Sequence, residues 1–101
     1  MDKTEHLLTC LIEECAEVQK AAAKALRFGL DDHHPNDPLG TNAKDIAHEC
    51  VDLIAVYEML TEEGVISALN VAELKQKKKD KVLKYLDYAK KRGTVYEKLH
   101  D

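Results

Sequence analysis

Residues 7–31 read LLTCLIEECAEVQKAAAKALRFGLD, and the spacing of the apolar side chains in this stretch decides the fold. With one interruption, these side chains recur at alternating steps of four and three residues, at Leu7, Leu11, Val18, Ala21, Ala25 and Phe28. Such spacing is typical of the buried face of an α-helix. We expect the helix to open at Thr4 and Glu5 and to run to about Arg27, with Gly29 ending it.

A second helix is expected after residues 30–41, where two prolines and several turn-forming residues predict an irregular loop. Asn42 is the expected N-cap, with Asp45 three residues later, and Gly64 is the expected end. This segment has its own apolar stripe, formed by Ile46, Leu53, Val56 and Leu60.

A third helix is expected between the capping pair Asn70 and Glu73 and about Arg92, where Gly93 would end it. The chain carries no strand signals, and its five aromatic residues include no Trp, which favours helices over a β-sandwich. A chain of 101 residues has the size of one domain, so we predict a single domain that spans residues 1–101. We therefore predict an all-α helical bundle, completed by dimerisation because three unequal helices do not enclose a symmetric core.

Composition and charge exclude several classes of function. The formal net charge of −4 lacks the basic character of a nucleic-acid-binding protein. No apolar run approaches the length of a membrane span or of a signal-peptide core. The three cysteines, Cys10, Cys15 and Cys50, show no CxxC spacing and are expected to be reduced thiols. These features predict a cytoplasmic protein.

Two acidic pairs interrupt the apolar stripes. Glu14 occupies a stripe position in the first helix and Glu49 one in the second, and Glu17 and Asp52 follow them by three residues. Residues three apart share one face of a helix. A carboxylate on a packing face is costly unless it is paired or binds a metal. Antiparallel packing of the two stripes would therefore bring four acids together.

Carboxylate oxygens are the ligands that hard divalent cations prefer, so the four acids predict a Mg²⁺ site in which Mn²⁺ can substitute. Glu13 adds a fifth acid that can hold a further ion or orient a water molecule.

Two other interpretations remain open, and a third, a di-iron site, fails on its residue pattern. A single ExxE pair is most often a solvated helix face. A di-iron bundle requires Glu-x-x-His pairs, whereas His48 directly precedes Glu49. A non-catalytic helical interaction or regulatory module would pair the acids with basic residues of a partner protein.

Residues 13–17 (EECAE) and 49–52 (ECVD) resemble the EExxE…ExxD signature of the MazG-like all-α nucleoside triphosphate pyrophosphohydrolases. This family is related to the dimeric dUTPases and the phosphoribosyl-ATP pyrophosphohydrolases. The resemblance extends over about residues 5–93 and is greatest to the short, single-module members often encoded by bacteriophages. The chain departs from compact members in the 31 residues that separate the two motifs.

The resemblance implies Mg²⁺-dependent hydrolysis of a nucleoside triphosphate between its α- and β-phosphates, which yields a monophosphate and pyrophosphate. It implies metal ligands at Glu14, Glu17, Glu49 and Asp52, and catalytic roles for Glu13 and Glu14 in activating water. It also implies a homodimer or tetramer, located in the host cytoplasm if a phage encodes it. A purine deoxynucleotide such as dGTP is the candidate substrate.

Five residues are candidates for substrate binding: Lys24, Arg27, Asn42, Lys78 and Lys81. Lys24 and Arg27 follow the first acidic pair by ten residues, and an arginine suits bidentate contact with phosphate. A charge near a helix C-terminus that complements the dipole explains both equally well. Lys78 lies at stripe spacing in a lysine-rich segment, which is otherwise expected to be solvated. His33, His34 and Asn36 could read a base, or belong to an exposed polar loop.

Overall fold

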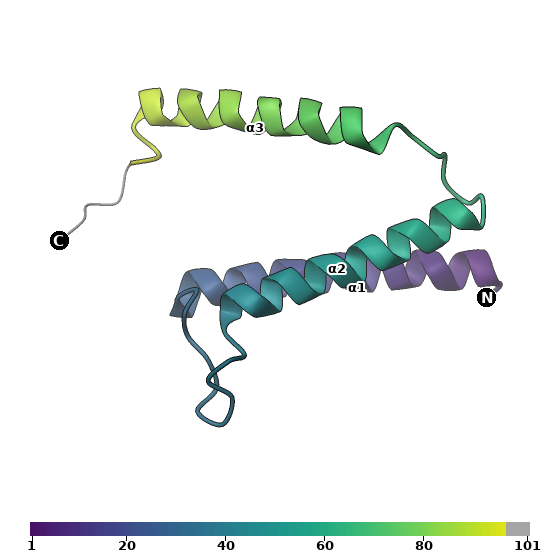
Figure 1. Ribbon diagram of the computed structural model, residues 1–101, viewed down its shortest axis with the longest axis horizontal. Coiled ribbons are helices and arrows are strands. Elements are labelled where there is room, and N and C mark those ends of the chain that lie inside the picture. The colour runs from purple at the N-terminus through teal and green to yellow at the C-terminus, as the bar shows by residue number, and fades with distance from the viewer. Residues whose placement is uncertain (97–101) are drawn as a thin grey trace. The chain divides into compact units, whose positions relative to one another are not determined.

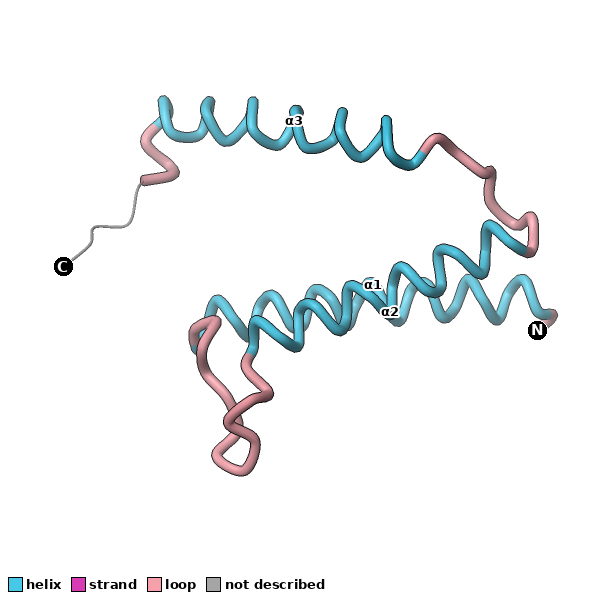
Figure 2. The backbone as a smooth tube through the Cα atoms, in the orientation of Figure 1, coloured by secondary structure: helices cyan, strands magenta, loops and turns pink. Residues whose placement is uncertain are grey.

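The computed structural model describes residues 1–96 and contains three helices (Figures 1 and 2). They are α1 (Lys3–Phe28), α2 (Asn42–Glu62) and α3 (Val71–Arg92). Over these 96 residues there is no strand, and the single isolated β-bridge joins His33 to Thr41. The all-helical prediction is confirmed. The chain divides into two compact units, residues 1–67 and 68–101.

Helix α1 begins earlier than its sequence predicts. Asp2 is the N-cap: its carboxylate accepts a hydrogen bond from the Glu5 backbone N–H at 2.8 Å, and the Glu5 carboxylate accepts one from the Asp2 backbone N–H. This capping box satisfies two helix-end donors that would otherwise be unpaired. Gly29 ends the helix as predicted, with a φ of 101° that favours glycine.

Helix α2 begins at Asn42, but Thr41 is its N-cap, so the prediction of Asn42 as the cap is wrong. The Thr41 hydroxyl accepts a hydrogen bond from the Lys44 backbone N–H at 3.3 Å. The Asn42 side chain is instead buried, and its amide donates to the Gly29 carbonyl at 2.8 Å. The physical reason is that Asn42 pairs with the end of α1, which leaves its threonine neighbour to cap α2.

Helices α1 and α2 pack side by side and antiparallel (Figure 1). At one end, the Lys3 ammonium contacts the Glu63 carboxylate at 2.7 Å. At the other, Asn42 joins Gly29. Between these ties lie the predicted stripes: Leu7, Ala25 and Leu60 are buried, whereas Leu11, Val18, Ala21, Ile46, Leu53 and Val56 are half-buried. Phe28 departs from its stripe and is 53% exposed.

The loop between α1 and α2 is closed by backbone hydrogen bonds at its base. The Asn42 N–H donates to the Asp32 carbonyl and the Ala43 N–H to the Leu30 carbonyl, both at 2.9 Å. At its tip, the Gly40 N–H donates to the Asp37 carboxylate at 3.1 Å. These bonds shape the segment that the sequence predicts as irregular.

The second unit contains α3, which is capped by Asn70 and ended by Gly93 as predicted. Helix α3 has no buried residue. Its large apolar side chains are between 37% and 62% exposed: Val71, Leu74, Val82, Leu83, Tyr85, Leu86 and Tyr88.

Among the described residues, none of the helices is both long and apolar enough to cross a membrane.

Candidate metal centre

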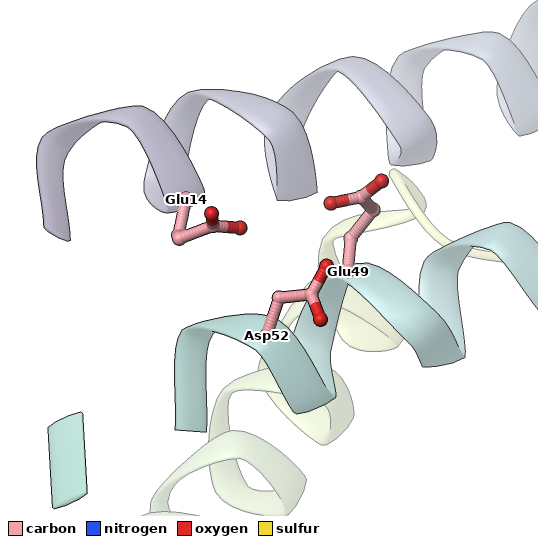
Figure 3. A group of neighbouring side chains, drawn as sticks. All are labelled: Glu14, Glu49 and Asp52. Carbon is pink, nitrogen blue, oxygen red and sulfur yellow. The ribbon is translucent and has the colours of Figure 1, made fainter. Parts of the chain in front are cut away.

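Three carboxylates from two helices meet on the seam between α1 and α2 (Figure 3). One oxygen from each of Glu14, Glu49 and Asp52 lies within 4.8 Å of the other two. Glu14 comes from α1, and Glu49 and Asp52 come from α2. The two glutamates are half-buried and Asp52 is exposed. We refer to these three residues as the carboxylate group.

The helix geometry explains why the three side chains meet. Glu49 and Asp52 are one turn apart and share a face of α2. Glu14 interrupts the apolar stripe of α1 and therefore faces the seam. The Lys3–Glu63 ion pair and the Asn42–Gly29 hydrogen bond lie at opposite ends of the α1–α2 pair. Together they fix the register that places Glu14 opposite the two acids of α2.

The electrostatics of the carboxylate group are those of unbalanced negative charge. Burial, which disfavours the charged form, is the largest cause that raises the pKa of Glu14 above its usual value of 4.5. The charges of Asp52, Glu49, Glu17 and Glu13, in that order, raise it further. A cation bound among these oxygens would offset both effects.

Glu17 lies beside the carboxylate group. It lines a depression of about 240 Å³ together with Glu49, Lys20, Lys24 and Asp45. The structure thus brings three of the four predicted metal ligands into one tight group and places the fourth in the adjoining depression. Glu13 is exposed and acts on Glu14 through its charge.

The predicted substrate-binding residues of the first unit occupy different environments. Lys24 lines both the depression beside the carboxylate group and a larger cavity next to the loop. The Arg27 guanidinium lies over the Phe28 ring, 4.6 Å from its centroid. Asn42 also lines the larger cavity, but its amide N–H is bound to the Gly29 carbonyl.

Lys78 and Lys81 belong to α3 in the second unit. Lys78 lines a shallow apolar depression of about 390 Å³ with Lys79, Val82 and Leu83. Lys81 is exposed.

Sequence reasoning missed Lys20 and Asp45 as residues near the carboxylate group. The helical spacing carries a signal for both. Lys20 follows Glu17 by three residues and Asp45 precedes Glu49 by four, so each shares a face with a predicted ligand.

The donor set fits a hard divalent cation. All three groups offer carboxylate oxygens, the ligands that Mg²⁺ and Mn²⁺ prefer, and the exposure of Asp52 leaves the group open to solvent. A Mg²⁺ ion usually retains water and is held by one or two carboxylates plus phosphate oxygens. The arrangement is therefore suited to binding a metal together with a phosphorylated ligand.

Comparison of the chain with protein-family models, curated proteins and solved structures finds no significant match.

Proposed function

We propose that this protein is a Mg²⁺-dependent nucleoside triphosphate pyrophosphohydrolase that releases a nucleoside monophosphate and pyrophosphate. The observation that carries the proposal is the convergence of Glu14, Glu49 and Asp52 within 4.8 Å on a helix seam. Carboxylates on packing faces oppose folding, which favours a functional reason for placing them there. The EExxE…ExxD resemblance supplies the reaction class.

In the proposed site, Glu14, Glu17, Glu49 and Asp52 hold Mg²⁺. When bound, the metal neutralises negative charge on phosphate oxygens and makes water more acidic. Glu13 and Glu14 act together as the base, and one of their two carboxylates accepts the proton of the attacking water. The water oxygen bonds to one phosphorus of the α–β anhydride, and the bridging oxygen leaves with the other phosphate. Lys24, beside Glu17 and Glu49, supplies positive charge to the phosphates.

The test is a pyrophosphate-release screen of all canonical NTPs and dNTPs with Mg²⁺ and with Mn²⁺. A purine deoxynucleotide such as dGTP is the proposed preference. We expect Glu49→Gln to lower turnover by more than about 100-fold, since even losing a group that only supports a metal ligand costs about 10- to 100-fold.

Glu58→Gln is the matched control, because Glu58 is an exposed glutamate on α2, nine residues from Glu49 and on the opposite face of the helix. Equal loss in both variants, or no release from any nucleotide by folded protein, would refute the proposal. The second outcome would assign the carboxylate group to a binding or regulatory module.

We further propose that the protein acts as a homodimer or tetramer through α3. Residues 1–67 contain five Lys or Arg against fourteen Asp or Glu, and residues 68–101 contain ten against five. The units thus carry net charges of −9 and +5, and oppositely charged surfaces favour association. A lone helix with an exposed apolar face gains most of its stability from packing.

Light scattering coupled to size-exclusion chromatography tests the assembly. Val82→Lys, on the exposed apolar face of α3, is expected to reduce the oligomer to a monomer. Leu39→Lys introduces the same charge at a position that is 77% exposed in the loop, and should leave the assembly intact. A monomeric parent protein at tens of micromolar would rule the proposal out.

A further inference from the structure

A cavity of about 380 Å³ lies where the loop meets the C-terminal turns of α1 and the N-terminal turn of α2. Its volume is within the range of about 300–1,000 Å³ typical of small-molecule sites. We call it the loop cavity. We propose that it binds the nucleoside part of the substrate, with the phosphates directed along the seam to the carboxylate group. This orientation rests on the function proposed above.

The loop cavity adjoins the carboxylate group. Lys24 and Asp45 line both this cavity and the depression that contains Glu17 and Glu49. Asp45 precedes Glu49 by one helical turn, about 6 Å along α2. A nucleotide spans such a distance, because several single bonds of about 1.5 Å separate its α-phosphorus from its base. Lys24, at the junction, is positioned to contact the α-phosphate.

Charge fixes which end of the nucleotide enters the loop cavity. Its walls carry the carboxylates of Asp32, Asp37 and Asp45 against the single ammonium of Lys24. Phosphates are repelled by such an environment, whereas the hydroxyl groups of a sugar and the amino groups of a base donate hydrogen bonds to carboxylates. The Asp37 carboxylate already accepts the Gly40 N–H on one oxygen, so Asp32 and Asp45 offer more acceptor sites to a ligand than Asp37 does.

Phe28 supplies an aromatic surface in the same wall. Its position in the apolar stripe predicts burial, but its side chain is 53% exposed. The Arg27 guanidinium lies against the ring and adds a planar cation next to it. Bases stack on exposed aromatic rings regardless of sequence, because every base has a π-face.

Two histidines in the wall present complementary hydrogen-bonding groups. The His33 Nδ1 lies 2.8 Å from the His34 carbonyl oxygen, which can only accept, so this nitrogen carries the proton and Nε2 of the neutral ring is an acceptor. The His34 Nδ1 accepts from the Asn36 N–H at 3.4 Å, which makes its Nε2–H a donor. One acceptor and one donor match a base edge, where both kinds of group occur side by side.

The test measures binding of the four deoxynucleoside monophosphates and of inorganic pyrophosphate to the full chain by calorimetry with Mg²⁺. Phe28→Ala is expected to weaken binding of the preferred monophosphate about tenfold or more, as stacking contributions imply. Asp32→Asn should also weaken it. Leu26→Ala is the matched control, since Leu26 is 89% exposed on α1 and is not a wall residue of the loop cavity. Pyrophosphate binding should be the same in all four proteins.

Turnover and binding separate the two proposals. Monophosphate binding that depends on Phe28 in a protein without turnover would support the loop cavity and refute the pyrophosphohydrolase. Turnover with unchanged monophosphate affinity in both Phe28→Ala and Asp32→Asn would overturn the loop cavity alone. Equal weakening of monophosphate and pyrophosphate binding would overturn the proposed orientation.

Discussion

Replacing Asn42 with alanine is expected to destabilise residues 1–67, because this side chain joins the start of α2 to the end of α1. Asn42 is 2% exposed, and its amide donates to the Gly29 carbonyl at 2.8 Å. Alanine would leave that carbonyl with only the longer hydrogen bond, 3.4 Å, from the Asp32 backbone N–H. Removing one partner of a buried hydrogen bond costs about 1–3 kcal/mol, and the space vacated by the amide adds to this cost.

Thermal unfolding followed by circular dichroism measures the effect. For a domain of 60–100 residues, 1 kcal/mol corresponds to roughly 4–8 °C in Tm, so we expect a decrease of about 5–20 °C. Asn36→Ala is the matched control: Asn36 is an exposed asparagine in the same connection, and surface changes usually lie within about 0.5 kcal/mol. Unfolding of both variants at the same temperature would refute the claim that the Asn42–Gly29 hydrogen bond stabilises the helix pair.

The same variant separates the loop cavity from the carboxylate group. Asn42 and its backbone bond to Asp32 shape the cavity wall, whereas Glu49 and Asp52 lie about two to three turns further along α2. We therefore expect Asn42→Ala to raise the KM for nucleotide while Mg²⁺ still raises the Tm. Loss of both effects together would contradict this separation.

Two further variants test the seam. Leu60→Ala, at a fully buried position, should cost about 2–5 kcal/mol in chemical denaturation, and a cost below about 1 kcal/mol would show that the core lies elsewhere. Glu14→Gln should raise the Tm of EDTA-treated protein and abolish stabilisation by Mg²⁺, which for the parent is about 1.4 kcal/mol at ten times the Kd. Because burial and neighbouring acids raise the pKa of Glu14 above 4.5, its unfavourable contribution is absent below pH 4.5 and grows as the pH rises through the folded-state pKa. The advantage of the variant should therefore disappear in acid, and an advantage independent of pH would refute the repulsion argument.

The helices could be predicted from the sequence because their signals are local, whereas the first residues of α1 and α2 could not. Thr41 and Asn42 are both good N-cap residues, and nothing within one turn distinguishes them. The choice depends on the Gly29 carbonyl, thirteen residues away, which takes the Asn42 amide. At the start of α1, Asp2 competes with Thr4 in the same way, and the capping box with Glu5 decides for Asp2.

The carboxylate group could be predicted in part for a similar reason. Spacing by three residues places Glu49 and Asp52 on one face of a helix, and the interrupted stripe places Glu14 on the seam. Spacing alone does not give the register between two helices. The sequence therefore could not show that Glu17 lies beside the carboxylate group and not within it. The loop cavity had no sequence signal, because its walls depend on hydrogen bonds that close the loop.

At the interface between α1 and α2, the residues that the proposed function needs are unfavourable for the stability of the fold. Over residues 1–96 the buried apolar side chains are those of Leu7, Ala25 and Leu60, so the core contributes only a small margin of stability. Glu14 and Glu49 nevertheless take stripe positions between these residues. Leucine at either position would extend the apolar seam and remove a repulsive charge. The acids therefore oppose the fold that positions them, which is the pattern expected where a site is selected for binding a cation rather than for packing.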